Sequence, residues 1–266
     1  MAIAKGSWPV KPLDTGSSII EKSITTYLWG FGEPVKIPRV MWVLEGSTTI
    51  VVDASVPMGG QAHEFIGEQF DRSSDQEPAN ALRLAGVNPA DVEYVLLTHL
   101  HWDHAGNCDL FPRARILVQQ DELRYALAPN RFFRKSFLAP LSGWSFPPYL
   151  LPSLEVVRGE VELVPGIKLV SVPGHTPGSQ AVLVDTPGGR LCVSGDAVMC
   201  YDNLERDIPP GFHIDVDDCM DSMDLLRRRS DAVLPSHDYR IFGGQPVAVF
   251  NGPPGPGSTG SSRIGS

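Results

Sequence analysis

The chain has 266 residues, 42% of them hydrophobic, and a formal net charge of −9 at pH 7. That length and apolar content suffice for one large hydrophobic core. No linker interrupts the region from about residue 40 to residue 245, so we predict a single domain there. The acidic balance argues against a nucleic-acid groove, which normally needs a basic stripe.

The cysteines and the apolar runs of the sequence predict the redox state of the thiols and the cellular compartment of the protein. The four cysteines are scattered without a Cys-x-x-Cys pair, which predicts reduced thiols and neither a thiolate zinc site nor a disulfide framework. The N-terminus lacks the apolar core of a signal peptide, and no apolar run reaches the roughly 18 residues of a membrane span. We therefore expect a cytoplasmic protein without membrane contact.

Three parts of the chain differ in composition. Residues 1–39 are predicted to form an N-terminal extension that packs over the functional site or at a dimer interface. Residues 40–250 form the predicted domain. Residues 251–266 are Gly, Ser and Pro with almost no apolar side chain, so we expect a tail that is disordered or left over from cloning.

The predicted elements begin with a hairpin of buried strands between residues 40 and 53. Helix-like spacing follows over residues 61–71 and 78–86, and a turn at residues 88–91 leads into the next strand. Residues 218–229 are predicted to form another helix, with three arginines in its last turn, where positive charge suits the helix dipole.

Metal-type side chains follow the strand after this turn. The apolar stretch 92–97 is bounded like a buried strand, and directly after it come His99, His101, Asp103 and His104. Three further strand-like runs each end in such a side chain, namely His175, Asp196 and His237. Because ligands gather in the crevice beyond the strand ends of sheet proteins, we expect these side chains to converge.

The number of these side chains indicates two metal ions. Five histidines and two aspartates exceed what one tetrahedral zinc ion uses, but they suit two adjacent metals that share a carboxylate. The predicted arrangement has His99, His101 and His175 on one metal, Asp103, His104 and His237 on the other, and Asp196 as the bridge. Imidazole and carboxylate without thiolate favour zinc, with manganese, iron and cobalt left open.

An irregular segment at residues 129–152 is rich in aromatic residues and proline. Long segments of this kind often form lids, binding loops or interfaces. We predict an apolar wall for the substrate, with core packing or a dimer contact as alternatives. The aromatic segment 27–31 is expected to reach over the site in the same way. Both segments favour a lipophilic or aromatic small substrate.

Taken together, the motifs resemble the metallo-β-lactamase superfamily. They are a His-x-His-x-Asp-His motif at 99–104, Pro-Gly-His-Thr-Pro-Gly at 173–178, Gly-Asp at 195–196 and Ser-His at 236–237. Within that superfamily, the His-Leu-His-Trp-Asp-His-Ala-Gly form most resembles the N-acyl homoserine lactonases. The resemblance implies an α+β fold, the single-domain αββα four-layer sandwich, and a supporting role for Asp53 without metal binding. It is also compatible with a homodimer.

The ligand set predicts the chemistry. Two divalent cations that share a water lower its pKa towards neutrality, and the resulting bridging hydroxide attacks the substrate carbonyl. Asp103 is a candidate catalytic residue, because a carboxylate beside the bridging oxygen can take the proton and pass it to the departing alkoxide.

One position departs from the lactonase pattern. The lactonases usually carry a tyrosine three residues after the bridging aspartate, where this chain has Met199. Tyr201 is one candidate donor to the substrate carbonyl, with an ordinary loop tyrosine as the alternative. His213 is the other candidate, and for it a packing or supporting role is the alternative.

Hydrolysis of a small lactone or ester is the leading predicted function. A thioesterase resembling the hydroxyacylglutathione hydrolases shares the ligand set, but it typically has a basic C-terminal region, which here is short and carries mainly Arg240. A β-lactam or amide hydrolase is disfavoured by the pattern at His101 and Asp103. A non-enzymatic metal-binding module would leave a complete hydrolytic ligand set idle.

Overall fold

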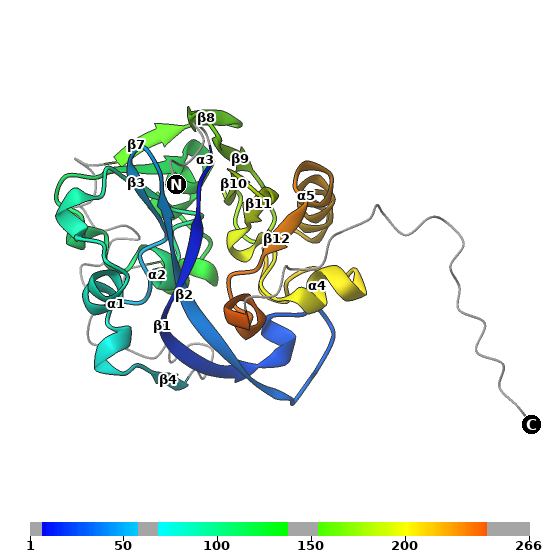
Figure 1. The fold of residues 1–266 in the computed structure, drawn as a ribbon. Coiled ribbons are helices and arrows are strands. Elements are labelled where there is room, and N and C mark those ends of the chain that lie inside the picture. The colour runs from blue at the N-terminus through cyan, green and yellow to red at the C-terminus, as the bar shows by residue number, and fades with distance from the viewer. Residues whose placement is uncertain (1–6, 58–68, 138–153, 244–266) are drawn as a thin grey trace, which may run out of the picture.

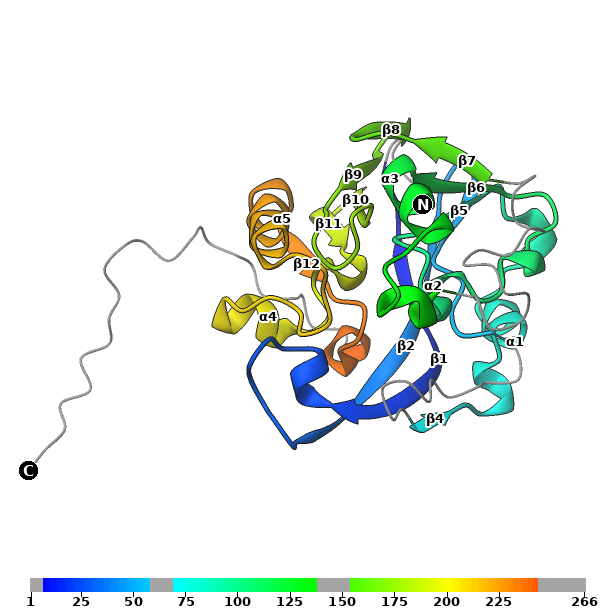
Figure 2. The same cartoon turned by 180° about the vertical axis from the view of Figure 1, so that it is seen from behind.

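The computed structural model describes residues 7–57, 69–137 and 154–243. Two β-sheets pack face to face, and helices cover the outer face of each sheet (Figure 1). One sheet is built from strands between residues 10 and 157 and the other from strands between residues 161 and 234, as the colours also show from behind (Figure 2). This α+β arrangement is the predicted αββα four-layer sandwich.

The first sheet has seven strands in the order β4-β1-β2-β3-β5-β6-β7. The long strands β1 and β2 pair antiparallel, whereas β3, β5, β6 and β7 pair in parallel. The strands are β1 Val10–Glu21, β2 Pro34–Glu45, β3 Thr49–Val52, β4 Gln69–Asp71, β5 Tyr94–Leu96, β6 Arg115–Gln119 and β7 Leu154–Val157. Strand β1 thus belongs to the sheet, although the sequence assigns residues 1–39 to an extension.

The second sheet has five strands in the order β12-β11-β10-β9-β8. Its neighbours are antiparallel except for β11 and β12, which are parallel. The strands are β8 Val161–Val164, β9 Ile167–Ser171, β10 Gln180–Thr186, β11 Gly189–Val193 and β12 Ala232–Leu234.

Strand β2 is buried on both faces because it lies between two cores. Trp42 and Leu44 pack into the core between the two sheets, and Met41 and Val43 pack into the core beneath the helices of the first half. Successive side chains of a strand point to opposite faces, so a strand with a core on each side reads as one continuous apolar run.

The helices α1, α2 and α3 lie on the outer side of the first sheet, and α4 and α5 lie on that of the second (Figure 1). They are α1 Pro78–Leu84, α2 Trp102–Ala105, α3 Gln120–Leu127, α4 Tyr201–Arg206 and α5 Val216–Arg229. Short 3-10 helices are η1 Lys22–Ile24, η3 Ser74–Gln76, η4 Pro89–Asp91, η5 Cys108–Leu110, η6 Phe133–Ser136, η8 Gly195–Ala197 and η9 Tyr239–Gly243. Among the described residues, no helix has the length and apolar content to cross a membrane.

The helices predicted at 78–86 and 218–229 agree with α1 and α5. The helix predicted at 61–71 is wrong in the part that the structure describes. Of the predicted helix at 61–71, residues up to 68 lie outside the described residues, and residues 69–71 form strand β4. Pairing of β4 with β1 is a contact between distant parts of the chain, which local helical spacing does not reveal. The predicted tail at 251–266 also lies outside the described residues.

Candidate metal centre

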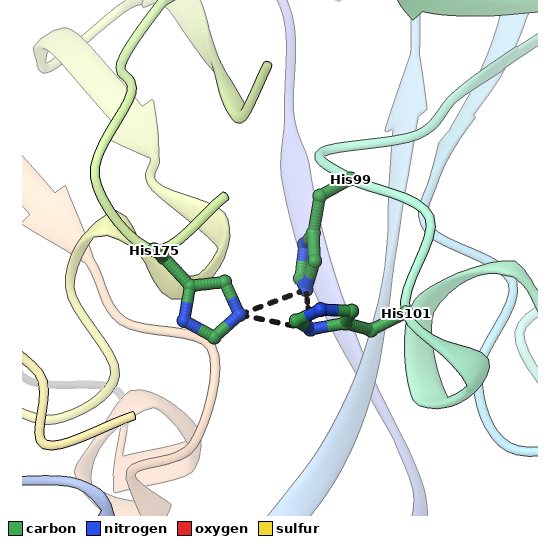
Figure 3. Close-up of side chains that lie close together, drawn as sticks. All are labelled: His99, His101 and His175. Carbon is green, nitrogen blue, oxygen red and sulfur yellow. Dashed lines mark hydrogen bonds between the residues drawn. The ribbon is translucent and has the colours of Figure 1, made fainter. Parts of the chain in front are cut away.

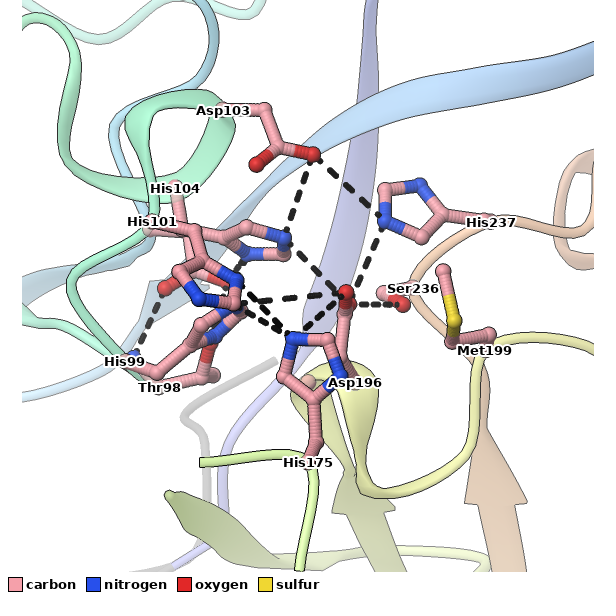
Figure 4. Close-up of polar contacts among 12 residues, drawn as sticks. Thr98, His99, His101, Asp103, His104, His175, Asp196, Met199, Ser236 and His237 are labelled. Carbon is pink, nitrogen blue, oxygen red and sulfur yellow. Dashed lines mark hydrogen bonds and ion pairs between the residues drawn. The ribbon is translucent and has the colours of Figure 1, made fainter. Parts of the chain in front are cut away.

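The seven predicted metal-type side chains lie together at the edge where strands β5, β9, β11 and β12 end (Figure 4). The segment after β5, including α2, supplies His99, His101, Asp103 and His104, and the later strand ends supply His175, Asp196 and His237. Each side chain is at least nine-tenths buried. They form overlapping groups whose ligand atoms lie within 4.8 Å of one another.

We call His99, His101 and His175 the first ligand group (Figure 3). His99 Nε2 lies 3.0 Å from His101 Nδ1 and 3.2 Å from His175 Nε2, and the last two atoms of this triangle are 3.0 Å apart. Three nitrogens that bind one tetrahedral zinc ion at about 2.0–2.1 Å stand roughly 3.3 Å apart. The triangle therefore fits one metal ion.

Asp103, His104 and His237 form the second ligand group. Asp103 Oδ2 lies 3.5 Å from His104 Nε2 and 3.7 Å from His237 Nε2. Both imidazole nitrogens are buried, and within the described residues they have no hydrogen-bond partner. Because buried polar atoms are nearly always satisfied, two such nitrogens beside a carboxylate indicate a place for a second metal ion.

Asp196 lies between the two groups (Figure 4). Its Oδ1 is 3.3 Å from His104 Nε2 and 3.2 Å from His237 Nε2. Its Oδ2 is 3.4 Å from His175 Nε2, and Ser236 donates a hydrogen bond of 2.6 Å to Oδ1. One carboxylate oxygen thus faces each group, which is the position that a bridging ligand needs.

The outward ring nitrogens of three ligands are fixed by hydrogen bonds to oxygen. The pairs are His104 Nδ1 to Asp53 Oδ2 at 2.8 Å, His175 Nδ1 to Phe212 O at 2.6 Å, and His237 Nδ1 to Pro38 O at 3.0 Å. A hydrogen on Nδ1 makes Nε2 the atom through which each ring, once deprotonated there, can bind a metal at the centre of the site.

Asp53 supports both groups without belonging to either. Besides His104, it accepts hydrogen bonds from Thr98 N at 2.8 Å and Thr98 Oγ1 at 2.9 Å. The same Thr98 hydroxyl lies 3.1 Å from His99 Nδ1. Asp53 has φ of 61°, a left-handed conformation that is strained for a residue other than glycine. The chain holds this strained residue where its carboxylate contacts both Thr98 and the ligand His104.

The two groups differ in the protonation state that their surroundings favour. Burial lowers the pKa of all three imidazoles of the first ligand group, so they are neutral and able to bind a metal. Burial also opposes charge on His104, but the carboxylates of Asp196, Asp103 and Asp53 outweigh it and raise the pKa of that imidazole. The imidazoles of the first group are therefore uncharged, whereas the second group contains the Asp103 carboxylate and an imidazole whose protonated form its surroundings favour.

Glu122, to which the sequence assigns no function, joins the two loops of the first ligand group. Leu100 lies between His99 and His101 in the loop after β5, and its N–H donates to Glu122 Oε1 at 2.8 Å. Thr176, directly after the third histidine, donates its hydroxyl to Oε2 at 2.5 Å. Burial raises the pKa of Glu122 to about 7, against hydrogen bonds from Thr176, Leu100 and Gly178 that lower it.

Arg39 is a second residue to which the sequence assigns no function, because it lies in an apolar strand far from the motifs. Its side chain is buried, Nη1 donates to Asp103 Oδ2, and Nε donates to Ser18 Oγ at 3.0 Å. Burial would raise the pKa of Asp103, but Arg39 and the neighbouring imidazoles hold it well below its usual range. Asp103 is therefore a carboxylate in the folded protein.

A narrow cavity of about 50 Å³, partly open to solvent, leads to the centre. His101, Asp103, His175 and Asp196 lie on its lining. The rest of the lining consists of Ile20, Ile24, Ile37, Arg39, Trp102, Ser136, Met199 and Phe212. Most of this wall is apolar, and it comes from both halves of the chain.

Comparison with known proteins assigns the family. Residues 36–237 match the Metallo-beta-lactamase superfamily. The chain belongs to this superfamily. N-acyl homoserine lactonase AttM of Rhizobium radiobacter is 34% identical over 210 residues, covering 76% of this chain and 76% of the relative. N-acyl homoserine lactonase AiiA of Bacillus thuringiensis subsp. kurstaki is 28% identical over 223 residues, covering 80% and 83%.

Solved structures confirm the fold of this metallo-β-lactamase superfamily member. A B. thuringiensis AiiA variant with N-decanoyl-L-homoserine bound at the active site matches with a TM-score of 0.75 and 23% identity, over 93% of this chain and 98% of that one. AidC, described as a dizinc quorum-quenching lactonase, matches with a TM-score of 0.68 and 17% identity, over 90% of each chain. The resemblance to the N-acyl homoserine lactonase branch is thus found in both sequence and fold.

Neither candidate for the lactonase tyrosine is a lining residue of the described cavity, whereas Met199 is. Tyr201 begins α4, and its ring lies 4.5 Å from the guanidinium carbon of Arg240. His213 donates from Nδ1 to a backbone oxygen, and its ring packs against Tyr27 at 4.8 Å. Their catalytic roles stay predictions.

The predicted apolar walls are described only in part. Residues 138–152 of the segment 129–152 lie outside the described residues. Just before that gap, Ser136 lines the cavity, and the Phe137 ring lies 4.9 Å from the His101 ring. The segment 27–31 is largely exposed, and the isoleucines that precede it line the cavity instead.

Proposed function

We propose that this protein is a dinuclear metal-dependent lactonase that opens the ring of a small lipophilic lactone, with zinc as its metal. The observation that carries the proposal is Asp196, whose two oxygens face two complete ligand groups beside an apolar cavity. Relatives named N-acyl homoserine lactonases support a lactone as the substrate, and a structural neighbour described as dizinc supports the metal.

Each ligand has a defined task in this proposal. The first ligand group would hold one ion and the second ligand group the other, and Asp196 would be shared by both. When bound, the ions supply an activated water and a Lewis acid for the lactone carbonyl. The chain supplies orientation, because the hydrogen bonds from Nδ1 of three imidazoles keep their Nε2 atoms directed at the centre.

Asp103 is the residue to which we assign proton transfer. Its carboxylate lines the cavity beside the ligand groups, so it is placed to accept a proton from the attacking water and return it to the leaving alkoxide. In a lactone that alkoxide stays tethered to the acyl group as the ring opens, so the proton has a short distance to travel. The ion pair with Arg39 restrains the carboxylate before it takes up the proton.

The lining favours an apolar acyl chain or ring. Ile20, Ile24 and Ile37 form one part of the wall, and Met199 and Phe212 form another. Burying apolar surface of the substrate against these side chains contributes binding energy at roughly 25 cal/mol per Å². We therefore expect affinity to rise with acyl chain length.

A pH-stat assay of zinc-loaded protein tests the proposal. The substrates are acyl homoserine lactones with short and long chains, an aromatic lactone, a glutathione thioester and a β-lactam. We expect rapid acid release from the lactones, with activity removed by a chelator and restored by zinc. Turnover of only the thioester or the β-lactam would show that lactone is the wrong substrate, and full activity in chelator would show that the metal role is wrong.

A further inference from the structure

We propose that Arg39 is a positioning residue for the second ligand group: it holds Asp103 before metal binds and makes the second metal site weaker than the first. The inference rests on the proposed two-metal site and goes beyond it, since it assigns different affinities to the two ions. It also gives a task to a buried arginine that lies outside the ligand motifs.

The guanidinium is held by several elements at once. Arg39 lies in β2 and is 3% exposed. Its Nε donates to Ser18 Oγ of β1 at 3.0 Å, its Nη1 donates to Asp103 Oδ2, and its guanidinium carbon lies 5.4 Å from the centre of the Trp102 ring. The guanidinium is planar, donates two hydrogen bonds and packs against an aromatic ring. We therefore expect it to keep its position when a metal cation binds nearby.

The atom that Arg39 contacts is the atom that the second metal needs. Asp103 Oδ2 is the carboxylate oxygen 3.5 Å from His104 Nε2 and 3.7 Å from His237 Nε2. Both nitrogens are buried and lack a hydrogen-bond partner among the described residues. A metal in this group and the guanidinium of Arg39 therefore share one oxygen. Two cations a few ångströms apart in a buried site repel each other strongly, so Arg39 lowers the affinity for the second ion.

The same strand also fixes another member of this group. Pro38, next to Arg39, accepts a hydrogen bond from His237 Nδ1 at 3.0 Å. Strand β2 thereby holds Asp103 through a side chain and His237 through its backbone. The second ligand group is preformed by β2 rather than assembled by the metal.

Charge balance explains why such a residue is useful. Asp53, Asp103 and Asp196 are 2%, 9% and 4% exposed, and each has a carboxylate oxygen within 3.5 Å of a ring nitrogen of His104. Buried carboxylates without countercharge destabilise a fold. Arg39 supplies a permanent positive charge, so the metal-free protein keeps the site folded while the second ion binds reversibly.

Metal affinity separates this role from general structural support. Competition with a chromophoric chelator gives a zinc dissociation constant for each site, and cobalt(II) spectra report which ligand group is filled. In Arg39→Gln, which keeps an amide donor but removes the charge, we expect the second dissociation constant to fall about tenfold or more while the first stays within about threefold. The metal-free variant should also melt at a lower temperature than the metal-free wild type.

Two further variants make the test decisive. Arg39→Lys keeps the charge, so its second dissociation constant should stay near that of the wild type. This variant can be measured even if Arg39→Gln folds poorly without metal. Arg72→Gln is the matched control, because the Arg72 side chain is 3% exposed and also bonds to β1, but through Thr15 O. It should leave both constants unchanged.

Three results would overturn the inference: a second constant that rises in Arg39→Gln, equal changes at both sites, or an Arg39→Lys protein that binds the second ion as tightly as Arg39→Gln. No substrate is used in these titrations. A protein that shows the expected metal shifts but hydrolyses no lactone would contradict the proposed function and leave this inference intact.

Discussion

The two ligand groups lie side by side but are stabilised in different ways. The first ligand group consists of three neutral imidazoles, and its two loops are tied together by hydrogen bonds to Glu122. The second ligand group contains a carboxylate, which pairs with Arg39, and an imidazole that bonds to Asp53. The difference shows that one group depends on the relative position of two loops, whereas the other depends on the balance of buried charge.

This contrast follows from where the ligands lie in the chain. The first group joins the loop after β5 to the loop after β9, so a residue between these loops has to fix their distance. Glu122, at the beginning of α3, lies between them and accepts from both. In the second group, Asp103 and His104 are adjacent residues of α2, so the helix fixes their separation, and the buried charge still has to be balanced.

Loss of the residue shared by both groups should have the largest effect. In Asp196→Asn we expect both metals to bind poorly and kcat/KM to fall by about a thousandfold or more, because the carboxylate that faces both ions loses its charge. Metal content per chain and lactone hydrolysis measure this. Asp185→Asn, which removes a surface carboxylate paired with Arg190, is the control. Normal metal content in Asp196→Asn would contradict the bridging assignment.

The connection through Glu122 should depend on pH. Its pKa is raised from 4.5 to about 7, so the folded state binds a proton more tightly than the unfolded state between these values. The stabilisation is therefore complete below about pH 4.5 and is lost as pH rises through 7, by at most about 3 kcal/mol. Urea unfolding of the metal-free protein at pH 5 and pH 8 should show a larger loss for the wild type than for Glu122→Gln. Equal losses would mean that Glu122 titrates normally.

The same residue should distinguish the two metal sites. In Glu122→Gln one acceptor oxygen becomes an amide, so one of the two loops loses its hydrogen bond, and we expect the first dissociation constant to rise about tenfold. The second constant should stay the same, which is the reverse of the result expected for Arg39→Gln. Asp121→Asn is the control, because Asp121 is the exposed neighbour of Glu122 on α3. A change confined to the second constant would show that the two groups are not independently supported.

The seven ligands could be predicted from the sequence because their signals are local. Four of them lie within six residues, and the others directly follow strand-like runs, so the general rule about strand ends was enough to bring them together. The layers were predicted through the resemblance that these motifs carry. Local pattern was less informative for β1, which contains Pro12 and Gly16 and alternates poorly, and for β4, which has three residues.

The residues that support the ligands could not be found in this way. Arg39 and Asp103 are 64 positions apart, and Glu122 is 22 positions from Leu100 and 54 from Thr176. In a sequence, an arginine within an apolar strand and a glutamate in a short helix resemble ordinary solvated residues. Their burial, and therefore their importance, depends on the packing of distant elements.

The smallest effects are expected for residues that belong to neither group. Tyr201 stacks on Arg240 and His213 packs on Tyr27, and neither lines the described cavity. In Tyr201→Phe and His213→Ala we therefore expect kcat/KM for a lactone to stay within about threefold of the wild type, since only a donor that reaches the reacting oxygen contributes strongly. A loss of a hundredfold in kcat at normal metal content, in either variant, would instead identify that side chain as the donor that replaces the lactonase tyrosine at Met199.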